Sequence, residues 1–204
     1  MRREFHVRFC EGLGGRFPRA TRLIILFKRG EDARRVMKVI GRRFERFGLR
    51  LHPDKTQLLS FNSPGLRLPR AQRARSFDFL GLTHYWVRSR KGRWVVRQRT
   101  AKDRFSRGLR AFKLRCRRLL HAPVGVQHNK LTALLRGHYA YYGVTGNGDA
   151  LGRFRAEAIR IWGRSLARRN RRRFAWARFE RTRRRFPFPP ARPYRSVCPS
   201  EPSV

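Results

Sequence analysis

A lysine in a turn is the first candidate for a chemical role in this sequence. The stretch RLHPDKTQLLSFN, residues 50–62, has two apolar runs hinged on a His-Pro-Asp-Lys-Thr turn that contains Lys55. A lysine held in such a turn can offset the charge of a phosphate or donate a proton to a leaving group. A solvated turn lysine that binds nothing is the alternative that the residues leave open.

The stretch GHYAYYG, residues 137–143, suggests acid–base chemistry or stacking on nucleic-acid bases. Its spacing argues for packing instead, because His138, Tyr139 and Tyr142 fall on the same helical face as several leucines. Those leucines are Leu131, Leu134 and Leu135. Tyr141 falls on the opposite face, so we expect it to be exposed and free to stack on a base.

Arginines on the outer faces of two expected helices are the third chemical feature. The ones that we expect to contact phosphate are Arg115, Arg117, Arg118, Arg164, Arg168 and Arg169. A guanidinium group binds phosphate through two parallel hydrogen bonds and also stacks on bases. Such contacts set the position of a nucleic acid rather than read its sequence.

The overall charge points to the same kind of partner. The chain has 52 Lys and Arg against 12 Asp and Glu, a net charge of +40 with a pI near 12.0, and both halves are basic. Such a field attracts polyanions strongly, so nucleic acid is the expected partner. Hydrophobic residues make up 40% of the chain, which is enough to form a core.

The cysteines and apolar runs exclude several other classes of protein. Cys10, Cys116 and Cys198 are scattered, so neither a disulfide framework nor a zinc knuckle is indicated. The apolar runs are too short to span a bilayer, and the first residues lack the apolar stretch of a signal peptide. We therefore expect no membrane partner and a cytoplasmic location.

An α+β portion is expected to position these residues over 23–99, after an irregular leader at 1–22. The run LIILF at 23–27 predicts a buried strand, and the following apolar period predicts a helix that begins near Glu31 and stops at Gly48. A strand, turn and strand are expected over 49–61, and a loop over 62–75. FDFLGLTHYW (77–86) and RWVVRQR (93–99) predict two strands of a hairpin with Gly92 in its turn.

A helical portion is expected over 100–186. Thr100 and Asp103 resemble a capping box at the start of its first helix. Apolar stripes then predict helices ending near 119, at about 126–142 and at about 149–169, and a fourth is indicated at 173–185. The tail at 187–204 is rich in proline and is expected to be extended or disordered.

Four stretches occur in an order and spacing that resemble a known family. They are GLRLHPDKTQLLSF, FDFLGLTHY, RKGRWVV and LRGHYAYYGVTGN, and they resemble the C-terminal half of bacterial group II intron-encoded reverse transcriptases, the maturases. The resemblance covers roughly residues 23–190. It implies the end of a polymerase palm, with short antiparallel strands and one helix, followed by an α-helical thumb, also called domain X.

The resemblance also assigns roles to individual residues. Lys55 corresponds to a lysine close to the incoming triphosphate. Phe79, Leu80 and Gly81 correspond to the primer-grip hairpin, where glycine lets the backbone approach the primer end. A glycine at a β-bulge is the plainer interpretation of Gly81. The thumb clasps template and primer and also binds intron RNA.

The catalytic acids of that family are missing here. The complete enzymes hold two divalent metal ions, Mg²⁺, with carboxylates that include a Tyr-Ala-Asp-Asp box just before the apolar strand. In this chain Arg19-Ala20-Thr21-Arg22 occupies that place, and no Asp-Asp pair occurs anywhere. Glu31 and Asp32 are better explained by the start of a helix. We therefore expect no catalytic residue, metal ligand or cofactor in this chain.

The expected function is RNA binding without polymerase activity. The chain would bind intron RNA, or a template–primer of RNA and DNA, as a fragment of a maturase that assists RNA splicing. One alternative is a part of an active RNA-directed DNA polymerase that an upstream reverse-transcriptase polypeptide completes. A non-functional pseudogene product is another. If the chain is an RNA-binding fragment without polymerase activity, the helical portion is expected to carry most of the RNA affinity.

Overall fold

The protein is a mixed α+β chain, as its sequence predicts. The structure, a computed structural model, describes residues 4–12, 21–51, 56–61, 64, 76–169 and 175–193. It divides into two compact units, one formed by Met1–Leu80 with Tyr85–Val96 and the other by Gly81–His84 with Arg97–Val204. Within the described residues, no helix has the length and apolar composition that crossing a bilayer requires.

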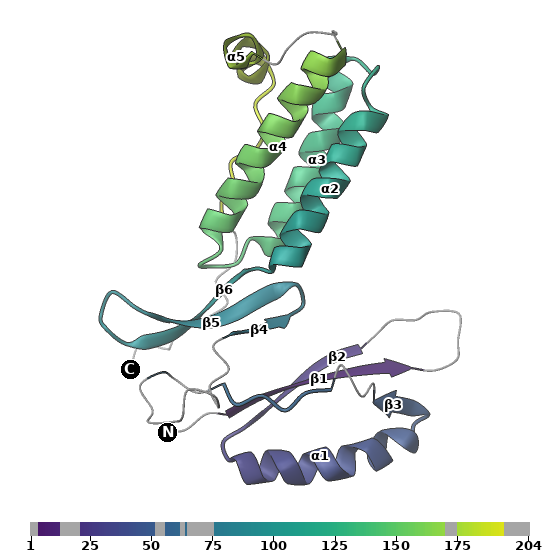
Figure 1. Cartoon of the computed structure of the whole chain (residues 1–204), viewed down its shortest axis with the longest axis vertical. Helices are drawn as coiled ribbons and strands as arrows, with labels where there is room; N and C mark the ends of the chain where they lie inside the picture. Colours follow the sequence, from purple (N-terminus) through teal and green to yellow (C-terminus); the bar gives the residue numbers. More distant parts are fainter. Residues whose placement is uncertain are drawn as a thin grey trace, which may run out of the picture. The chain divides into compact units, whose positions relative to one another are not determined.

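The first unit contains a three-stranded antiparallel sheet (Figure 1). Its strands are β1 (Glu4–Gly12), β2 (Thr21–Phe27) and β3 (Leu49–Leu51), in the order β2-β1-β3. The expectation that residues 1–22 are irregular is therefore wrong for Glu4–Gly12. The sequence analysis missed a signal here, because Phe5, Val7 and Phe9 alternate with Glu4, His6 and Arg8, which is the period of two that strands show. The strand pairs with neighbours on both sides.

Helix α1 (Gly30–Glu45) packs against β3 and β2 of this sheet. Acidic residues occupy its first turn and basic residues its last, as the partial charges at helix ends favour. Ala33 and Ile40 are its buried side chains. Gly48 follows the helix with φ +67°, a left-handed conformation that glycine adopts without a steric penalty. The helix and its stop agree with the sequence prediction.

The expected strand, turn and strand over 49–61 form only in part. Beyond β3, Gln57 makes an isolated bridge and residues 58–61 have no regular structure, so the second predicted strand is wrong. Phe61 is buried all the same, because its ring packs edge-on to Phe77 and is stacked on Trp86, with centroids 4.8 and 5.2 Å away. Aromatic packing therefore holds this segment in place of a strand ladder.

The next sheet has the order β4-β5-β6 (Figure 1). Its strands are β4 (Ser76–Phe79), β5 (Leu82–Arg88) and β6 (Trp94–Thr100). The predicted hairpin with Gly92 in its turn is confirmed: Gly92 has φ +72° and donates its N–H to the Ser89 carbonyl at 2.9 Å. The apolar run 77–86 is not one strand, however, because a second turn divides it at Leu80 and Gly81.

The second unit is a helical bundle, and its helices agree closely with the predicted ones. They are α2 (Lys102–Arg118), α3 (Val124–Tyr142), α4 (Gly148–Arg169) and α5 (Trp176–Arg185). Helices α2, α3 and α4 lie alongside one another (Figure 1). Their apolar stripes form a core whose largest buried side chains include Trp162, Tyr139 and Phe154.

The predicted capping box at Thr100 does not form. Ala101 is the N-cap residue of α2, and no side chain caps it. Thr100 is the last residue of β6, and its hydroxyl accepts a hydrogen bond from Asn147 Nδ2 at 2.9 Å. Asn147 lies in the loop between α3 and α4, so a tertiary contact takes the hydroxyl that a local cap would have used.

The chain after α5 is packed against the bundle. Residues 187–193 have no helix or strand, but Phe188 is only 4% exposed and belongs to the core. Its ring stacks on His128 at 5.6 Å and lies 4.9 Å from Trp162. Arg155 donates hydrogen bonds to the carbonyls of Phe188 and Pro189. The part of the expected loose tail that the structure describes is therefore a structural element of the bundle.

Candidate nucleic-acid interface

A groove between α2 and α4 gathers basic side chains on the helical bundle. Its volume is about 610 Å³. It is lined by Lys113, Cys116, Arg117, Leu120, Ile161, Arg164, Ser165 and Arg168. These eight side chains, from the described part of the chain, include four cations and no carboxylate. The groove therefore has a strongly positive potential.

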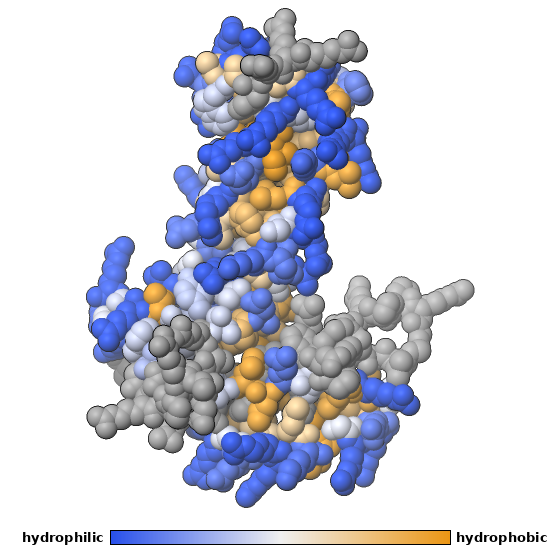
Figure 2. Space-filling model, in the orientation of Figure 1, coloured by the Kyte–Doolittle hydropathy of each residue, from blue (hydrophilic) through white to orange (hydrophobic). Residues whose placement is uncertain are grey.

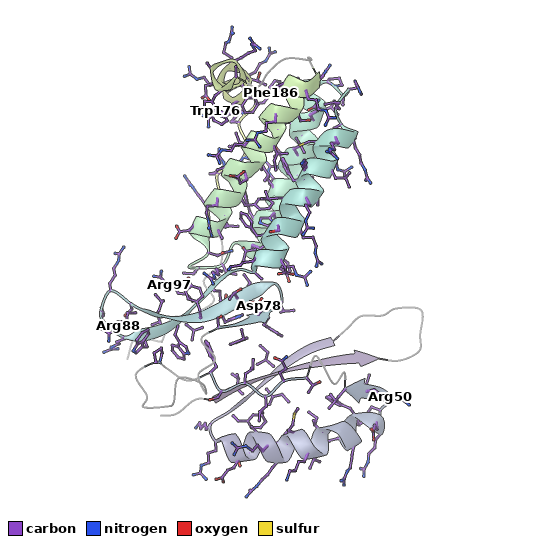
Figure 3. The ribbon with its side chains drawn as sticks, viewed as in Figure 1. Arg50, Asp78, Arg88, Arg97, Trp176 and Phe186 are labelled. Carbon is purple, nitrogen blue, oxygen red and sulfur yellow. The ribbon has the colours of Figure 1, made fainter. Side chains whose placement is uncertain are left out.

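The sequence explains why cations gather at this end of the bundle. α2 and α4 both end in basic turns, where the partial negative charge of a helix C-terminus favours cations. Cys116, Ala158 and Trp162 turn inward to the core, which leaves the neighbouring positions facing outward. Figure 3 shows nitrogen-tipped side chains projecting from the outer faces of both helices.

The floor of the groove is apolar and chemically inert. Leu120 and Ile161 are half-buried, and Figure 2 shows an apolar strip along the bundle with hydrophilic side chains on its borders. Cys116 is buried, and burial raises the pKa of its thiol to about 12. The thiol stays protonated near neutral pH, so it is not a nucleophile there. The groove can therefore bind an anion, and its buried thiol is not available for covalent chemistry near neutral pH.

The structure brings three of the predicted phosphate-binding arginines together in this groove: Arg117, Arg164 and Arg168. The sequence analysis missed Lys113, which lies one helical turn before Arg117 and joins them. The signal was present, because residues four positions apart on a helix share a face. Arg115 and Arg118 are exposed on α2 but do not line the groove.

Arg169 has a structural partner. Its Nη1 donates a hydrogen bond of 2.9 Å to the carbonyl of Ala122, in the turn between α2 and α3. The same carbonyl accepts a hydrogen bond from Nε2 of the buried Gln127, also at 2.9 Å. Gln127 in turn accepts one from Trp162 Nε1 at 3.1 Å. Arg169 therefore joins, from the surface, a network whose inner part, the hydrogen bond between Trp162 and Gln127, is buried.

The aromatic stretch at the end of α3 lies largely as predicted. Tyr139 is buried, His138 and Tyr142 are half-buried, and Tyr141 is 57% exposed. Burial and the neighbouring Tyr141 raise the pKa of Tyr142. Leu134 is an exception: it is 40% exposed, so its expected inward position is wrong.

His138 is held as a neutral packing residue. Its ring stacks on Phe154 with centroids 3.7 Å apart and planes 11° apart. Burial lowers its pKa to about 4, so the ring is uncharged at neutral pH. A neutral ring pressed against phenylalanine supports the packing interpretation and not the acid–base one.

The residues that resemble a primer grip form a tight turn between β4 and β5. Phe79 ends β4, and Leu80 and Gly81 both have positive φ, +49° and +78°. Two successive positive values characterise type I′ hairpin turns, and they are unfavourable for leucine. Gly81 is therefore a turn residue and not a bulge. Leu80 is 45% exposed.

Gly81 also lies in a place where an added side chain would crowd its neighbours. A Cβ atom there would come within 3.0 Å of Tyr142 Oη and 3.2 Å of Arg104 Cγ. The Gly81 carbonyl accepts the N–H of Ala101 at 2.9 Å, just before α2 begins. Gly81 is thus held at the start of α2 through its backbone.

Two further sequence predictions, on Lys55 and on metal binding, stay predictions. Lys55 lies outside the described residues, so its environment is not assigned. Within the described ranges, no three His, Cys, Asp or Glu side chains lie close enough together to hold a metal ion.

Comparisons of the chain with protein-family models, curated proteins and solved structures find no match.

Proposed function

We propose that the chain binds RNA through its helical bundle and has no polymerase active site of its own. The basic groove carries this proposal: four cations line it, three of them arginines that the sequence singles out as phosphate ligands. Phosphate oxygens are the complementary partners of such a lining. The net charge of +40 adds long-range attraction for any polyanion.

The family resemblance suggests which RNA is bound. An α+β unit followed by a helical bundle agrees with the end of a palm followed by a thumb, and the four motifs occur in that order. We therefore assign the chain as a C-terminal part of a group II intron reverse transcriptase or maturase. Its ligand would be structured intron RNA or a template–primer.

The residues do not fit the Mg²⁺ of a complete polymerase of this family. The sequence has no Asp-Asp pair, and the described residues supply no cluster of ligating side chains. Two-metal catalysis needs several carboxylates around the ions. We therefore derive no catalytic step for this chain, and its own residues are assigned to binding alone.

Changing the groove charges tests the proposal. The full-length chain is titrated with a structured RNA between about 50 and 200 mM salt, and the affinity is expected to fall steeply as salt rises. Replacing Arg117, Arg164 and Arg168 together by Ala should weaken binding roughly 10- to 100-fold and reduce the salt slope by about three, since each phosphate contact releases counterions.

A matched variant separates the groove from the general charge of the protein. Arg110, Lys130 and Arg136 are exposed cations on the same bundle that do not line the groove. Replacing these three by Ala removes the same charge and should weaken binding less than about threefold. Lys55→Ala should have no effect, because without the catalytic acids no triphosphate would be held beside it. Equal weakening by the two triple variants would contradict the groove assignment.

A second candidate function is that of a polymerase part, in which another polypeptide completes the active site around the first unit. Exposed apolar side chains favour it: Leu26 on β2 is 58% exposed, Val39 on α1 is 60% exposed and Phe47 is 74% exposed. Primer extension distinguishes the two functions. The chain alone should give no extension. Extension after addition of a polypeptide that carries a Tyr-Ala-Asp-Asp box would establish the second function.

A further inference from the structure

The groove between α2 and α4 combines charge with an apolar floor, which phosphate binding does not need. Each wall is a stripe of four residues with the spacing i, i+3, i+4 and i+7, and all of them except Leu120, which follows the end of α2, lie on a helix. One wall is Lys113, Cys116, Arg117 and Leu120, and the other is Ile161, Arg164, Ser165 and Arg168. Each stripe therefore has two cations and two uncharged residues. If the cations bound only the phosphates of a nucleic-acid backbone, a flat polar surface would hold them equally well.

We propose that this groove takes one unpaired nucleotide of the bound RNA. The base packs against Leu120 and Ile161, and the phosphates on either side of it contact the four cations. This inference rests on the proposed function, since it names the part of the RNA that the groove recognises. The groove volume of about 610 Å³ falls within the range of roughly 300–1,000 Å³ for small-ligand sites.

An unpaired nucleotide fits better than a duplex. In an A-form helix the bases are stacked on one another and cannot reach an apolar floor, so a duplex would leave Leu120 and Ile161 in water. An unstacked base has two apolar faces that gain by leaving water. Arginine also stacks on bases through its planar guanidinium group, which gives Arg117, Arg164 and Arg168 a second role.

The lining predicts little preference for one base over another. Among the eight lining residues no aromatic ring and no side-chain amide occurs. The Ser165 hydroxyl already donates to the carbonyl of Cys116, at 3.5 Å. With few groups to read the edge of a base, recognition depends on its faces and its flanking phosphates. Any unpaired nucleotide of the RNA could therefore occupy the groove.

An abasic nucleotide provides the matched ligand for a test. Three RNA hairpins are compared on the full-length chain: one fully paired, one with a single bulged 2-aminopurine, and one with an abasic residue at the bulge. The two bulged hairpins have the same number of phosphates. We expect the base-bearing bulge to bind about 5- to 10-fold more tightly than the abasic one. The 2-aminopurine fluorescence should change on binding.

Two variants alter the floor and keep all four cations. Ile161→Ser and Leu120→Ser each remove part of its apolar surface. Either change should reduce the difference between the base-bearing and abasic hairpins to less than about twofold. Affinity for the fully paired hairpin should remain within about twofold of wild type. Circular dichroism checks folding, and if one variant fails to fold the other decides the result.

The failure of this inference is distinguishable from failure of the proposed function. If wild type binds the base-bearing and abasic hairpins equally, the inference is overturned. If the variant of Arg117, Arg164 and Arg168 nevertheless binds RNA more weakly than wild type, the proposed function still stands. If that triple variant binds every hairpin like wild type, the proposed function itself fails. An anionic amphiphile, like a nucleotide, combines a negative charge with an apolar surface and could bind the same groove. Saturable binding of laurate that Ile161→Ser weakens, together with RNA binding that shows no dependence on the base, would also overturn the inference.

Discussion

Asn147 holds the end of β6 through two hydrogen bonds between its side-chain amide and Thr100. Its Oδ1 accepts the Thr100 N–H at 2.8 Å, and its Nδ2 donates to Thr100 Oγ1 at 2.9 Å and to the Tyr142 carbonyl at 2.7 Å. Both residues are buried. One side chain thus joins the strand that leads into α2 to the loop between α3 and α4.

Asn147→Ala should destabilise the second unit by about 2–4 kcal/mol, because it removes three hydrogen bonds and leaves the buried Thr100 N–H without a partner. The Tyr142 carbonyl still accepts the Val144 N–H at 2.8 Å. Thr100→Val should cost only about 1 kcal/mol, since it removes a single acceptor. Urea denaturation measures both changes. The control is Asn129→Ala, at an exposed position of α3, with an expected effect below about 0.5 kcal/mol. A similar effect at both asparagines would show that the pairing contributes little.

Two glycines with similar backbone angles separate strain from packing. Gly81 and Gly92 have φ +78° and +72°, but only at Gly81 would an added Cβ meet other atoms within 4 Å. Gly92→Ala should cost about 1–2 kcal/mol from backbone strain alone. Gly81→Ala should cost at least about 1 kcal/mol more, because Tyr142 or Arg104 must move. Equal losses in a denaturation experiment would mean that the contact relaxes freely.

His138 should make the bundle less stable in mild acid. Its folded pKa is about 4, below the ordinary value of 6.5, because burial disfavours the charged ring. The unfolded chain binds a proton more readily, so the stabilising contribution is complete above about pH 6.5 and is lost as the pH falls toward 4. We expect this loss to reach roughly 2 kcal/mol, less than the pKa difference implies, since the ring is partly exposed.

His138→Phe provides the comparison for this pH effect. Phenylalanine keeps the stacking on Phe154 and the contact with Tyr142, but it does not titrate. The difference in unfolding free energy between wild type and the variant should therefore change between pH 7 and pH 4.5, with wild type losing more. The effects of all side chains that the two proteins share cancel in this difference. A constant difference across that range would contradict the buried, neutral state of His138.

Phe188 should be needed for a stable helical fragment. A fragment over 81–193 is expected to fold and to keep most of the RNA affinity, whereas one that stops at 186 loses Phe188 and the carbonyls that Arg155 binds. In the full-length chain, Phe188→Ala should cost about 3–5 kcal/mol, as for other buried phenylalanines. Thermal melting of the two fragments tests this directly. Identical melting temperatures would show that the segment after α5 only covers the surface.

Adjacent arginines at the end of α4 should have different roles. Arg168 lines the groove, so Arg168→Ala should weaken RNA binding about three- to tenfold and leave stability unchanged. Arg169 bonds to the Ala122 carbonyl, so Arg169→Ala should cost about 1 kcal/mol of stability and weaken RNA binding less. Anisotropy titration and urea denaturation of both variants measure the two quantities. The reverse pattern would exchange the roles.

The sequence by itself determined the features that depend on local periodicity. Helices α1 to α5 follow from apolar stripes at three- and four-residue steps, and the exposure of Tyr141 follows from its place opposite the stripe of α3. The turn at Gly92 and the stop at Gly48 follow from a conformation that glycine alone adopts easily. The basic outer faces follow from the same helical period, which leaves the arginines opposite the core.

Only the tertiary structure decided which side chains meet across the chain. The pairing of Thr100 with Asn147, the burial of Phe188 against His128, and the hydrogen bond from Arg169 to Ala122 each join residues more than 40 positions apart. The residues of β1 alternate between apolar and polar, but its place between β2 and β3 depends on strand pairing. Lys113 joins Arg164 in one groove only because α2 and α4 pack together there. Such contacts depend on how the elements pack, and local spacing does not contain that information.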